Sequence, residues 1–459
     1  MNIMEETANR RVTLLVTTMA SFLVPYMGSS INIALPSIGR EFSMDAISLS
    51  WVAASFILAA AMSLLPLGRI ADLYGRRRIF AWGILTYVVS SLLSGVSPSA
   101  GALIFSRVLQ GVGGAMIFST ALAILTSVFP AGERGRVLGI NVASVYLGLS
   151  LGPFLGGFLT QHFGWRGIFF ANVPLGLIMI ALVSLKLKGE WTGAREERFD
   201  LAGSIIYSLA LAAIMYGLSL LPGSSGAWII LVGALGLLAF LKWEGKVENP
   251  VLDINLFKRS TVFTFSNLAA LINYSATFAV GFLLSLYLQY VKGLGPQHAG
   301  LILVFQPLVQ AIFSPLAGRL SDRIEPRIVA SLGMALTVVG LILFTLLTPD
   351  TSMGFIIATQ ILLGLGFAFF SSPNTNAIMS SVDKRLFGVA SAVLGTMRLT
   401  GQMLSMGIVM MVFAGKMGKE PIASGNSLLF LGSAREAFLI FACLCLAGTF
   451  ASLARGRLH

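Results

Sequence analysis

The stretch Gly68-Arg69-Ile70-Ala71-Asp72-Leu73-Tyr74-Gly75-Arg76-Arg77-Arg78 follows a long apolar run, and a similar stretch follows another such run much later in the chain. The later copy reads Gly318-Arg319-Leu320-Ser321-Asp322-Arg323-Ile324-Glu325-Pro326-Arg327, with Glu325 where the first copy has its second glycine. Both begin with glycine, arginine, an aliphatic residue, a small residue and aspartate. Two copies on the same face of a membrane indicate parallel halves related by an axis along the membrane normal.

The composition predicts that lipid is the main solvent. The 459 residues are 56% hydrophobic and 11% charged, whereas a soluble domain carries about 25% charged residues. Apolar runs of about 18 residues or more recur, each long enough to cross roughly 30 Å of hydrocarbon. They lack a two-residue alternation, so they predict helices and an all-α integral membrane protein. The fourteen expected spans lie near 12–35, 46–67, 79–97, 101–129, 137–160, 167–187, 201–221, 226–243, 262–290, 297–317, 328–348, 353–381, 387–414 and 434–454.

The formal net charge of +12 is distributed unevenly between the two predicted faces. With the N-terminus inside, most Lys and Arg residues are inner: Arg10, Arg11, Arg69, Arg76, Arg77, Arg78, Arg134, Arg136, Lys186, Lys188, Arg195, Arg198, Lys242, Lys246, Lys258, Arg259, Arg319, Arg323, Arg327, Lys384, Arg385, Arg455 and Arg457. The outer ones are Arg40, Arg166, Lys292, Lys416, Lys419 and Arg435. Because positive charge accumulates on the cytoplasmic side, we expect a multi-pass protein of the cytoplasmic membrane with both termini in the cytoplasm. Nucleic-acid binding is the weaker interpretation of the basicity.

The repeat and the span count together predict the domain organisation. If each half contributes six helices, residues 1–187 form one bundle and residues 262–459 form the other. The segment 188–261 is then an inserted two-helix hairpin with flanking linkers. We expect the cavity between the halves near the membrane midplane, and a monomer surrounded by membrane lipids.

The first duplicated loop resembles the signature of the major facilitator superfamily. Its glycines, Gly68 and Gly75, permit a tight turn, and Asp72 can accept hydrogen bonds at a helix N-terminus. The candidate partner is the inner end of span 13, near Phe387, when the cavity opens outward. Arg76 and Asp322 join this predicted gating group. The alternative is that the arginines serve only as an orientation signal.

Two further stretches resemble motifs of the same superfamily. Residues 107–115 on span 4 read Arg-Val-Leu-Gln-Gly-Val-Gly-Gly-Ala. Span 5 carries a motif associated with antiporters, made of Gly148, Gly152, Pro153, Gly156 and Gly157. Glycines four residues apart permit close helix approach, and the proline favours a bend. We expect Gly152 and Pro153 at a bend or tight crossing against span 10; the alternative is ordinary transmembrane packing.

The chain also resembles the fourteen-helix drug:proton antiporter family over its whole length. The similar stretches are 32–36, 164–174, 287–289 and 388–391. This resemblance implies a secondary transporter that exports small amphiphilic organic compounds by alternating access, as an antiporter with protons as the candidate coupling ion. The alternative is an exporter or flippase of anionic or lipid-like amphiphiles without proton coupling.

One departure from that family concerns charge inside the membrane. Its members often carry an aspartate in span 1, but residues 26–32 read Tyr-Met-Gly-Ser-Ser-Ile-Asn. On the expected boundaries all nineteen carboxylates and all three histidines lie in loops or near helix ends. Arg107 and Arg398 do lie at depth, where a charge costs at least ~2.5–3.5 kcal/mol and requires a partner or water. Either arginine alternatively braces helices.

The predicted binding residues are polar and lie within the spans. They are Tyr26, Asn32, Arg107, Gln110, Asn141, Tyr146, Asn273, Tyr274, Gln306, Gln310, Asn374 and Arg398. We expect a net positive cavity that accepts neutral or anionic amphiphiles better than cations. A membrane hydrolase or acyl transferase would need a His or acidic base within the spans, so the sequence indicates no enzyme. It indicates no cofactor and no metal site either.

Overall fold

The computed structural model describes residues 3–187, 189–192, 198–383, 386–418, 420–422 and 424–456. Within these residues, fourteen segments are long and apolar enough to cross a membrane, which confirms the predicted number of spans. The expected inner residues Lys188, Arg195, Lys384, Arg385 and Arg457 and the expected outer residue Lys419 lie outside the described residues.

The first six spans form one packed group of helices. They are α1 (Ile3–Glu41), α2 (Ala46–Tyr74), α3 (Arg76–Gly95), α4 (Ala100–Val128), α5 (Ala131–Phe163) and α6 (Arg166–Leu185). Short polar side chains start several of them: Asp45 accepts the backbone N–H of Ser48 at the start of α2, and Ser99 accepts that of Ala102 at the start of α4. Such caps satisfy N–H groups that have no partner within the helix. Within this group α1 packs on α5, α4 on α2 and α3, and α6 on α3.

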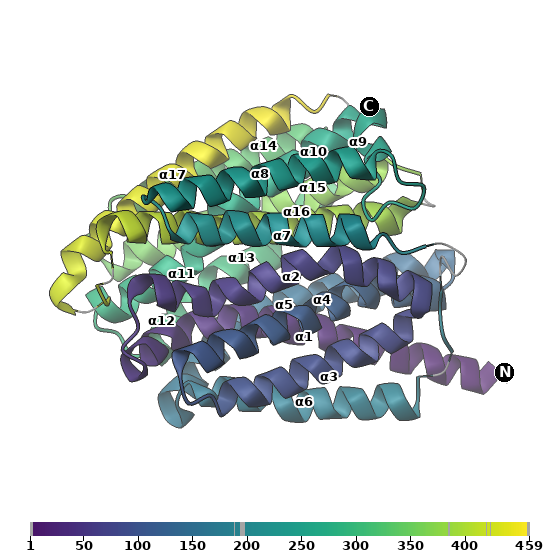
Figure 1. The fold of residues 1–459 in the computed structure, drawn as a ribbon, viewed down its shortest axis with the longest axis horizontal. Coiled ribbons are helices and arrows are strands. Elements are labelled where there is room, and N and C mark those ends of the chain that lie inside the picture. The colour runs from purple at the N-terminus through teal and green to yellow at the C-terminus, as the bar shows by residue number, and fades with distance from the viewer. Residues whose placement is uncertain are drawn as a thin grey trace.

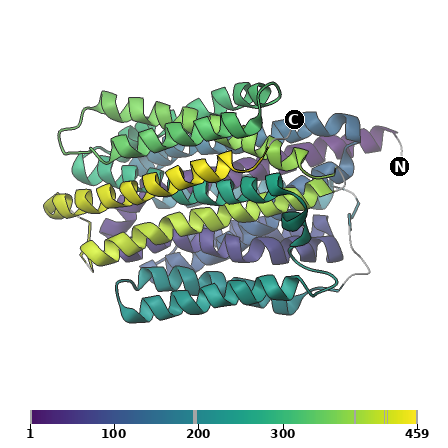
Figure 2. The ribbon, with the colours of Figure 1, turned by 90° about the horizontal axis from the view of Figure 1, so that it is seen from above.

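The next two spans, α7 (Leu201–Ser219) and α8 (Ser224–Glu244), form a hairpin at one side of the bundle, drawn in teal in Figure 2. Helix α7 contacts α2 and α16, and the Tyr207 hydroxyl donates to the Ala61 carbonyl oxygen at 3.1 Å. Helix α8 leaves Trp228 and Val232 about two-thirds exposed, at 67% and 64%. Exposed apolar side chains of this size are expected on a surface that faces lipid. A short helix, α9 (Asn255–Arg259), follows the hairpin.

The last six spans form the second group. They are α10 (Thr261–Thr277) continued by α11 (Ala279–Leu286) and η1 (Tyr287–Val291), α12 (Pro296–Leu303) continued by α13 (Phe305–Ser321), α14 (Pro326–Phe344), α15 (Met353–Ser380), α16 (Phe387–Lys416) and α17 (Ser427–Leu453). The ninth and tenth spans are thus interrupted rather than continuous. At the first interruption the Ala279 N–H is satisfied by the Ser405 side chain on α16, at 3.0 Å. A neighbouring helix supplies the hydrogen bond because lipid offers none.

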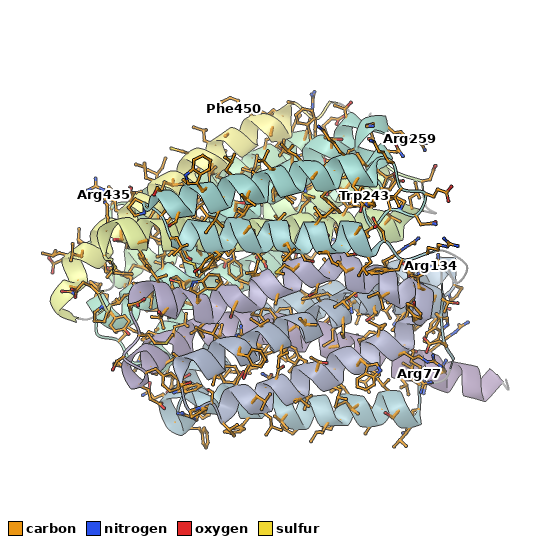
Figure 3. The ribbon with its side chains drawn as sticks, viewed as in Figure 1. Arg77, Arg134, Trp243, Arg259, Arg435 and Phe450 are labelled. Atoms are coloured by element: carbon orange, nitrogen blue, oxygen red, sulfur yellow. The ribbon has the colours of Figure 1, made fainter. Side chains whose placement is uncertain are left out.

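Both ends of the described chain lie at the same end of the bundle, the right-hand end in Figure 1. The side chains of Arg77, Arg134 and Arg259 gather there, whereas Arg435 lies toward the other end (Figure 3). We call these the basic end and the opposite end. The arrangement agrees with parallel halves that each begin at the basic end.

Two helices are longer than the sequence indicated. Helix α1 begins at Ile3 rather than near residue 12, and α17 begins at Ser427 rather than near residue 434. As a result Glu436 lies more than two turns inside α17, not within a turn of its start. It remains near the opposite end, because it pairs with the terminal residue of α16, Lys416, at 2.5 Å. Apolar runs locate the hydrocarbon core, whereas a helix continues beyond it as long as its backbone bonds persist.

Candidate functional site

The two groups of helices are joined across the opposite end by side chains of the ninth span. Three of these side chains donate to backbone carbonyl oxygens of α1: Ser285 to Asn32 at 2.6 Å, Gln289 to Ile33 at 3.0 Å and Tyr290 to Pro36 at 3.2 Å. Asn32, a predicted binding residue, therefore contributes a backbone carbonyl to this contact. The opposite end of the molecule is closed in this structure.

The glycines of α5 make close crossings with two different helices. A side chain at Gly152 would overlap Ser29 and lie 2.8 Å from the Tyr26 carbonyl oxygen, and one at Gly156 would lie 2.8 Å from Ser30; these residues are on α1. Gly148 also faces α1. Gly152 therefore meets α1 rather than span 10, contrary to the expected partner.

Span 10 meets the adjacent face of α5. The carbonyl oxygen of Pro153 lies against Gly300 of α12, and a side chain at Gly157 would lie 2.5 Å from the Pro296 carbonyl oxygen. The expected contact with span 10 thus applies to Pro153 but not to Gly152. One face of α5 packs within its own group of helices, and the next face crosses to the other group.

Arg107 is held inside the first group. Its side chain is 1% exposed. The Nε atom donates to the Val52 carbonyl oxygen at 3.1 Å, Nη1 donates to the Gln110 side chain, and the guanidinium lies 4.6 Å from the centre of the Phe56 ring. Gln110 in turn donates to Ser91 at 2.7 Å. These contacts join α2, α3 and α4, which corresponds to the bracing alternative for Arg107.

Several other predicted binding residues also hold helices together. Asn141 donates to Ser21 at 2.8 Å and so joins α5 to α1, and Tyr26 is 4% exposed. In the second group, Asn374 accepts from the Arg455 guanidinium at 3.0 Å, and Asn273 is 3% exposed. Asn141 and Asn374 thus join helices within their own groups, whereas Tyr26 and Asn273 are buried.

Four polar side chains do lie where the two groups meet. The guanidinium of Arg398, on α16, lies 5.1 Å from the centre of the Tyr274 ring on α10, and Tyr146 of α5 is its other electrostatic neighbour. The Tyr146 hydroxyl lies 3.2 Å from the Ser371 hydroxyl on α15. We call Arg398, Tyr274, Tyr146 and Ser371 the interface cluster. Ser371 was not among the predicted residues, because the polar stretch 371–376 does not indicate which of its side chains faces the other group.

The charge of Arg398 has no counter-charge among the described carboxylates, and its Nε atom is buried without a hydrogen-bond partner. A guanidinium has five N–H donors in a fixed planar arrangement that suits carboxylate, phosphate or carbonyl oxygens. On α13, the predicted residues Gln306 and Gln310 bond to each other at 3.2 Å. The interface cluster therefore has an unused donor and two aromatic rings.

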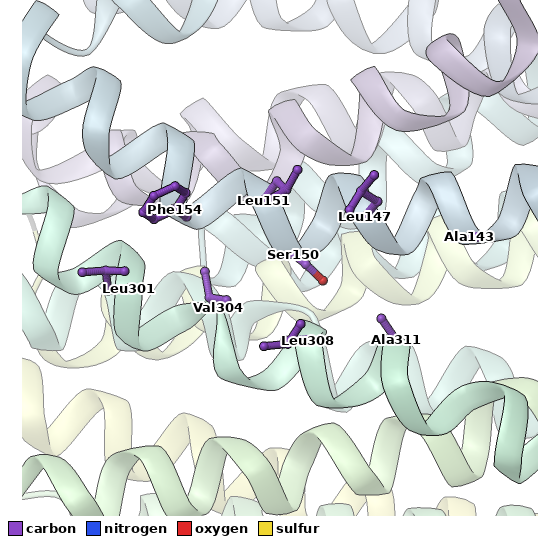
Figure 4. A pocket seen from close by; sticks show the side chains of 9 residues that line it. All are labelled: Ala143, Leu147, Ser150, Leu151, Phe154, Leu301, Val304, Leu308 and Ala311. Carbon is purple, nitrogen blue, oxygen red and sulfur yellow. The ribbon is translucent and has the colours of Figure 1, made fainter. Parts of the chain in front are cut away.

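An apolar hollow lies between α5 of the first group and α12 and α13 of the second (Figure 4). Its volume is about 340 Å³, and its walls are Ala143, Leu147, Ser150, Leu151, Phe154, Leu301, Val304, Leu308 and Ala311. None of these residues is charged. The hollow lies between the halves and opens at the surface, because Leu147, Leu301 and Leu308 in its walls are 52%, 43% and 41% exposed. The central positive cavity stays a prediction. The apolar hollow suits the hydrocarbon part of an amphiphile.

The duplicated loops lie at the basic end. Gly75 connects α2 to α3 with φ of +120°, a value that L side chains rarely adopt, and Glu190 occupies the space where a side chain would be. Asp72 pairs with Arg76 at 2.7 Å. Within the described residues no hydrogen bond or ion pair joins Asp72 to α16. In the second copy, Asp322 accepts from Asn376 of α15 at 3.1 Å.

This geometry gives a test of the predicted contact between Asp72 and the inner end of span 13, which we call the latch. The contact is expected only in the outward-open state. We expect Asp72→Asn to lower the outward-open population about two- to fivefold, because a charge at a helix N-terminus contributes roughly 0.3–1 kcal/mol. The reporter is Gly281→Cys, since a side chain at Gly281 would lie 3.6 Å from Asn32 within the closed opposite end. Labelling by an impermeant thiol reagent measures opening.

The background for this measurement carries Cys443→Ser and Cys445→Ala, which remove both native thiols. The control is Glu248→Gln, an exposed carboxylate near the basic end. Equal labelling rates in Asp72→Asn and the control would contradict the latch.

Comparison with known proteins agrees with this architecture. The family model of the Major Facilitator Superfamily matches residues 17–241 and 266–457. Puromycin resistance protein pur8 of Streptomyces alboniger is 33% identical over 411 residues, which cover 88% of this chain and 81% of that protein. Riboflavin transporter RibZ of Clostridioides difficile is 28% identical over 440 residues, covering 95% of each. Multidrug resistance protein Stp of Mycobacterium tuberculosis is 30% identical over 411 residues, covering 88% of this chain and 76% of that protein.

Solved structures agree with the fold. A bacterial homologue of the human lysosomal transporter Spinster, in an inward-facing and unoccupied conformation, matches with a TM-score of 0.67 at 18% identity, covering 97% of both chains. Peptide transporter POT in complex with sulfate matches with a TM-score of 0.69 at 15% identity, covering 95% of this chain and 94% of that one. The family and these neighbours are transporters rather than enzymes, as the sequence indicated. With two helical groups that each begin at the same end, fourteen spans and a family model matching most of its length, the chain belongs to the major facilitator superfamily.

Proposed function

We propose that this transporter exports small amphiphilic organic compounds across the cytoplasmic membrane, with its basic end in the cytoplasm. The observation that carries the proposal is that polar groups of the interface cluster and an apolar hollow both lie between the two halves. Aromatic rings and an apolar wall accept the hydrocarbon part of a substrate, and a few polar groups orient it. Relatives named for puromycin resistance, multidrug resistance and cephamycin export support the direction and the substrate class.

The proposed mechanism is alternating access by a monomer. Residues 1–187 and 262–459 rock against one another about the interface cluster, and the hairpin within 188–261 follows α2 and α16. The closed opposite end then corresponds to an inward-facing state. Opening it requires the three hydrogen bonds from the ninth span to α1 to break, while the latch at Asp72 forms. Antiport with protons belongs to the same proposal.

A second candidate is export or flipping of an anionic or lipid-like amphiphile without proton coupling. The observation that favours it is Arg398, whose guanidinium lies at the interface without a carboxylate partner among the described residues. An unpaired cation in a low-dielectric wall attracts an anion strongly. An organic cation would meet the same charge as repulsion. The two candidates therefore differ in the charge of the preferred substrate.

Transport by the purified protein in liposomes tests both candidates. Cationic, neutral and anionic fluorescent amphiphiles are compared, each with and without an imposed pH gradient. We expect flux of neutral or anionic probes that protein-free liposomes lack. Gradient-driven flux supports the antiporter, whereas gradient-independent flux of anionic probes supports the second candidate. Absence of flux for every probe would contradict both.

A further inference from the structure

Two buried carboxyl groups meet at the foot of the α7–α8 hairpin. Asp200 immediately precedes α7 and Glu244 ends α8, and the two residues are 8% and 3% exposed. Their side chains are near neighbours, because one oxygen of each lies within 2.5 Å of the same point beside Gly203. Both converge on Gly203, where a side chain would touch Asp200 Oδ2 and would lie 2.5 Å from Glu244 Oε1. Two adjacent carboxylates so far removed from water cannot both be ionised at low cost.

The two carboxyl groups differ in the hydrogen-bond donors that surround them. Asp200 accepts the backbone N–H of Gly203 at 2.9 Å and the indole N–H of Trp243 at 3.0 Å. Trp243 lies at the basic end of the hairpin, as labelled in Figure 3. Asp200 is also the N-cap of α7, where the helix dipole favours an anion. The Asp200 carboxyl group therefore already has two N–H donors.

Glu244 has the opposite surroundings. It is the last residue of α8, where the helix dipole disfavours an anion. Its Oε2 accepts the Leu252 backbone N–H at 2.8 Å, but its Oε1 is buried without a donor. Within the described residues neither Glu244 nor Asp200 forms an ion pair with a lysine or arginine. A proton on Oε1 would satisfy this atom, because it could then be donated to Asp200.

We propose that Asp200 and Glu244 form a proton-binding site, in which one proton resides on Glu244 Oε1 and is donated to the Asp200 carboxylate. The proton comes from water at the basic end and returns to it. The groups that face the pair from α7, α8 and the following segment are the N–H donors of Gly203, Trp243 and Leu252 and the backbone of Val251. When the proton leaves, two anions remain in contact and the hairpin foot is pushed apart.

The position of the site connects it to the helices between the halves. The shared proton links Asp200 at the start of α7 to Glu244 at the end of α8. The Glu244 side chain also accepts the backbone N–H of Leu252 and so fixes the segment that follows α8. Helix α7 is itself attached to α2 through Tyr207 and contacts α16. Protonation of the foot therefore determines how firmly the hairpin is held against the two helices at the junction of the halves. This inference is independent of the substrate proposed above.

Infrared spectroscopy of the full-length protein in lipid nanodiscs tests the site, because a neutral carboxyl group has a carbonyl band distinct from that of a carboxylate. We expect close to one neutral carboxyl per chain at pH 6, declining as the pH rises, that is absent in Glu244→Gln. Glu248→Gln, which changes an exposed carboxylate four residues away, should retain it. In Asp200→Asn the new amide can donate to Glu244 Oε1, so Glu244 ionises and the band is lost there too.

Thermal unfolding between pH 6 and pH 9 supplies a second measurement. A carboxyl group that the folded state holds protonated contributes stability below its folded titration point, and the contribution is lost as the pH rises through it. The Tm of the wild type should therefore fall by a few degrees more than that of Glu244→Gln. If Glu244→Gln does not fold, the proposal is tested by the infrared spectrum of Asp200→Asn and by the pH dependence of the wild-type carboxyl band. Three results would overturn the proposal: no neutral carboxyl at pH 6, persistence of the band in Glu244→Gln, or loss of the band on adding sodium in place of a bulky organic cation.

Discussion

Gly152→Val should reduce transport to about a tenth of the wild-type rate or less while the protein still inserts in the membrane. The new side chain would overlap Ser29 and press on the Tyr26 carbonyl oxygen of α1, and Ser30 already donates to the Gly152 carbonyl oxygen at 2.8 Å. Overpacking of this kind costs about 1–3 kcal/mol, and each 1.4 kcal/mol is a factor of about ten in a population or rate. Initial transport rates in liposomes, normalised to inserted protein, measure the effect.

The matched control is Gly139→Val on the same helix. An added side chain at Gly139 has no atom within 4 Å, so its transport should stay near the wild-type rate. Both variants change one glycine of α5 to the same residue, so helix propensity affects both alike. Full activity of Gly152→Val would show that the α1–α5 crossing does not limit transport. Loss of activity in both would point to the helix itself rather than to the crossing.

Arg398→Ala should weaken binding of an anionic or carbonyl-rich probe roughly tenfold or more, and should leave a cationic probe unchanged or improved. A hydrogen bond to a charged group contributes about 1.5–3 kcal/mol, and Arg398 has an unused donor beside two tyrosines at the interface. Arg398→Lys keeps the charge but loses the planar set of donors, so we expect an intermediate affinity. The concentration dependence of flux gives the apparent affinity for probes of each charge. It is compared among the wild type, Arg398→Ala and Arg398→Lys.

Arg435→Ala is the control, because Arg435 is an exposed arginine toward the opposite end of the molecule. Removing it changes the net charge by the same amount but leaves the interface cluster intact. If Arg398→Ala leaves anion handling untouched while organic cations are transported, the proposed role of Arg398 is wrong. A similar loss in Arg435→Ala would indicate a long-range effect of net charge.

The architecture could be predicted because it depends on features that are local in the sequence. The number of spans follows from the length of apolar runs, since the thickness of the hydrocarbon sets the length of a helix that crosses it. The two-fold arrangement follows from the repeated loops around Asp72 and Asp322. The helix ends at Ile3 and Ser427 were missed because an apolar run indicates that a helix is present but not the residue at which it begins.

The site could be predicted only as a set of candidates. Arg107 and Arg398 are each a single arginine within an apolar span, and the motif that begins at Arg107 does not indicate what its side chain contacts. In the structure Arg107 is enclosed by Val52, Gln110 and Phe56, whereas Arg398 lies where the two halves meet. The difference is the rotation of each helix about its axis, which is set by packing against its neighbours.

Span number, parallel halves and the uneven distribution of basic residues were thus readable from the residues alone, because each is a property of one segment and its solvent. Pairings between distant segments were not readable. Gly152 contacts α1, although the glycine motif does not indicate which helix it packs against. Asp200 lies near Glu244 only because α7 and α8 fold back on each other. Such contacts depend on how whole helices pack, and a polar residue acquires its role from the neighbours that packing supplies.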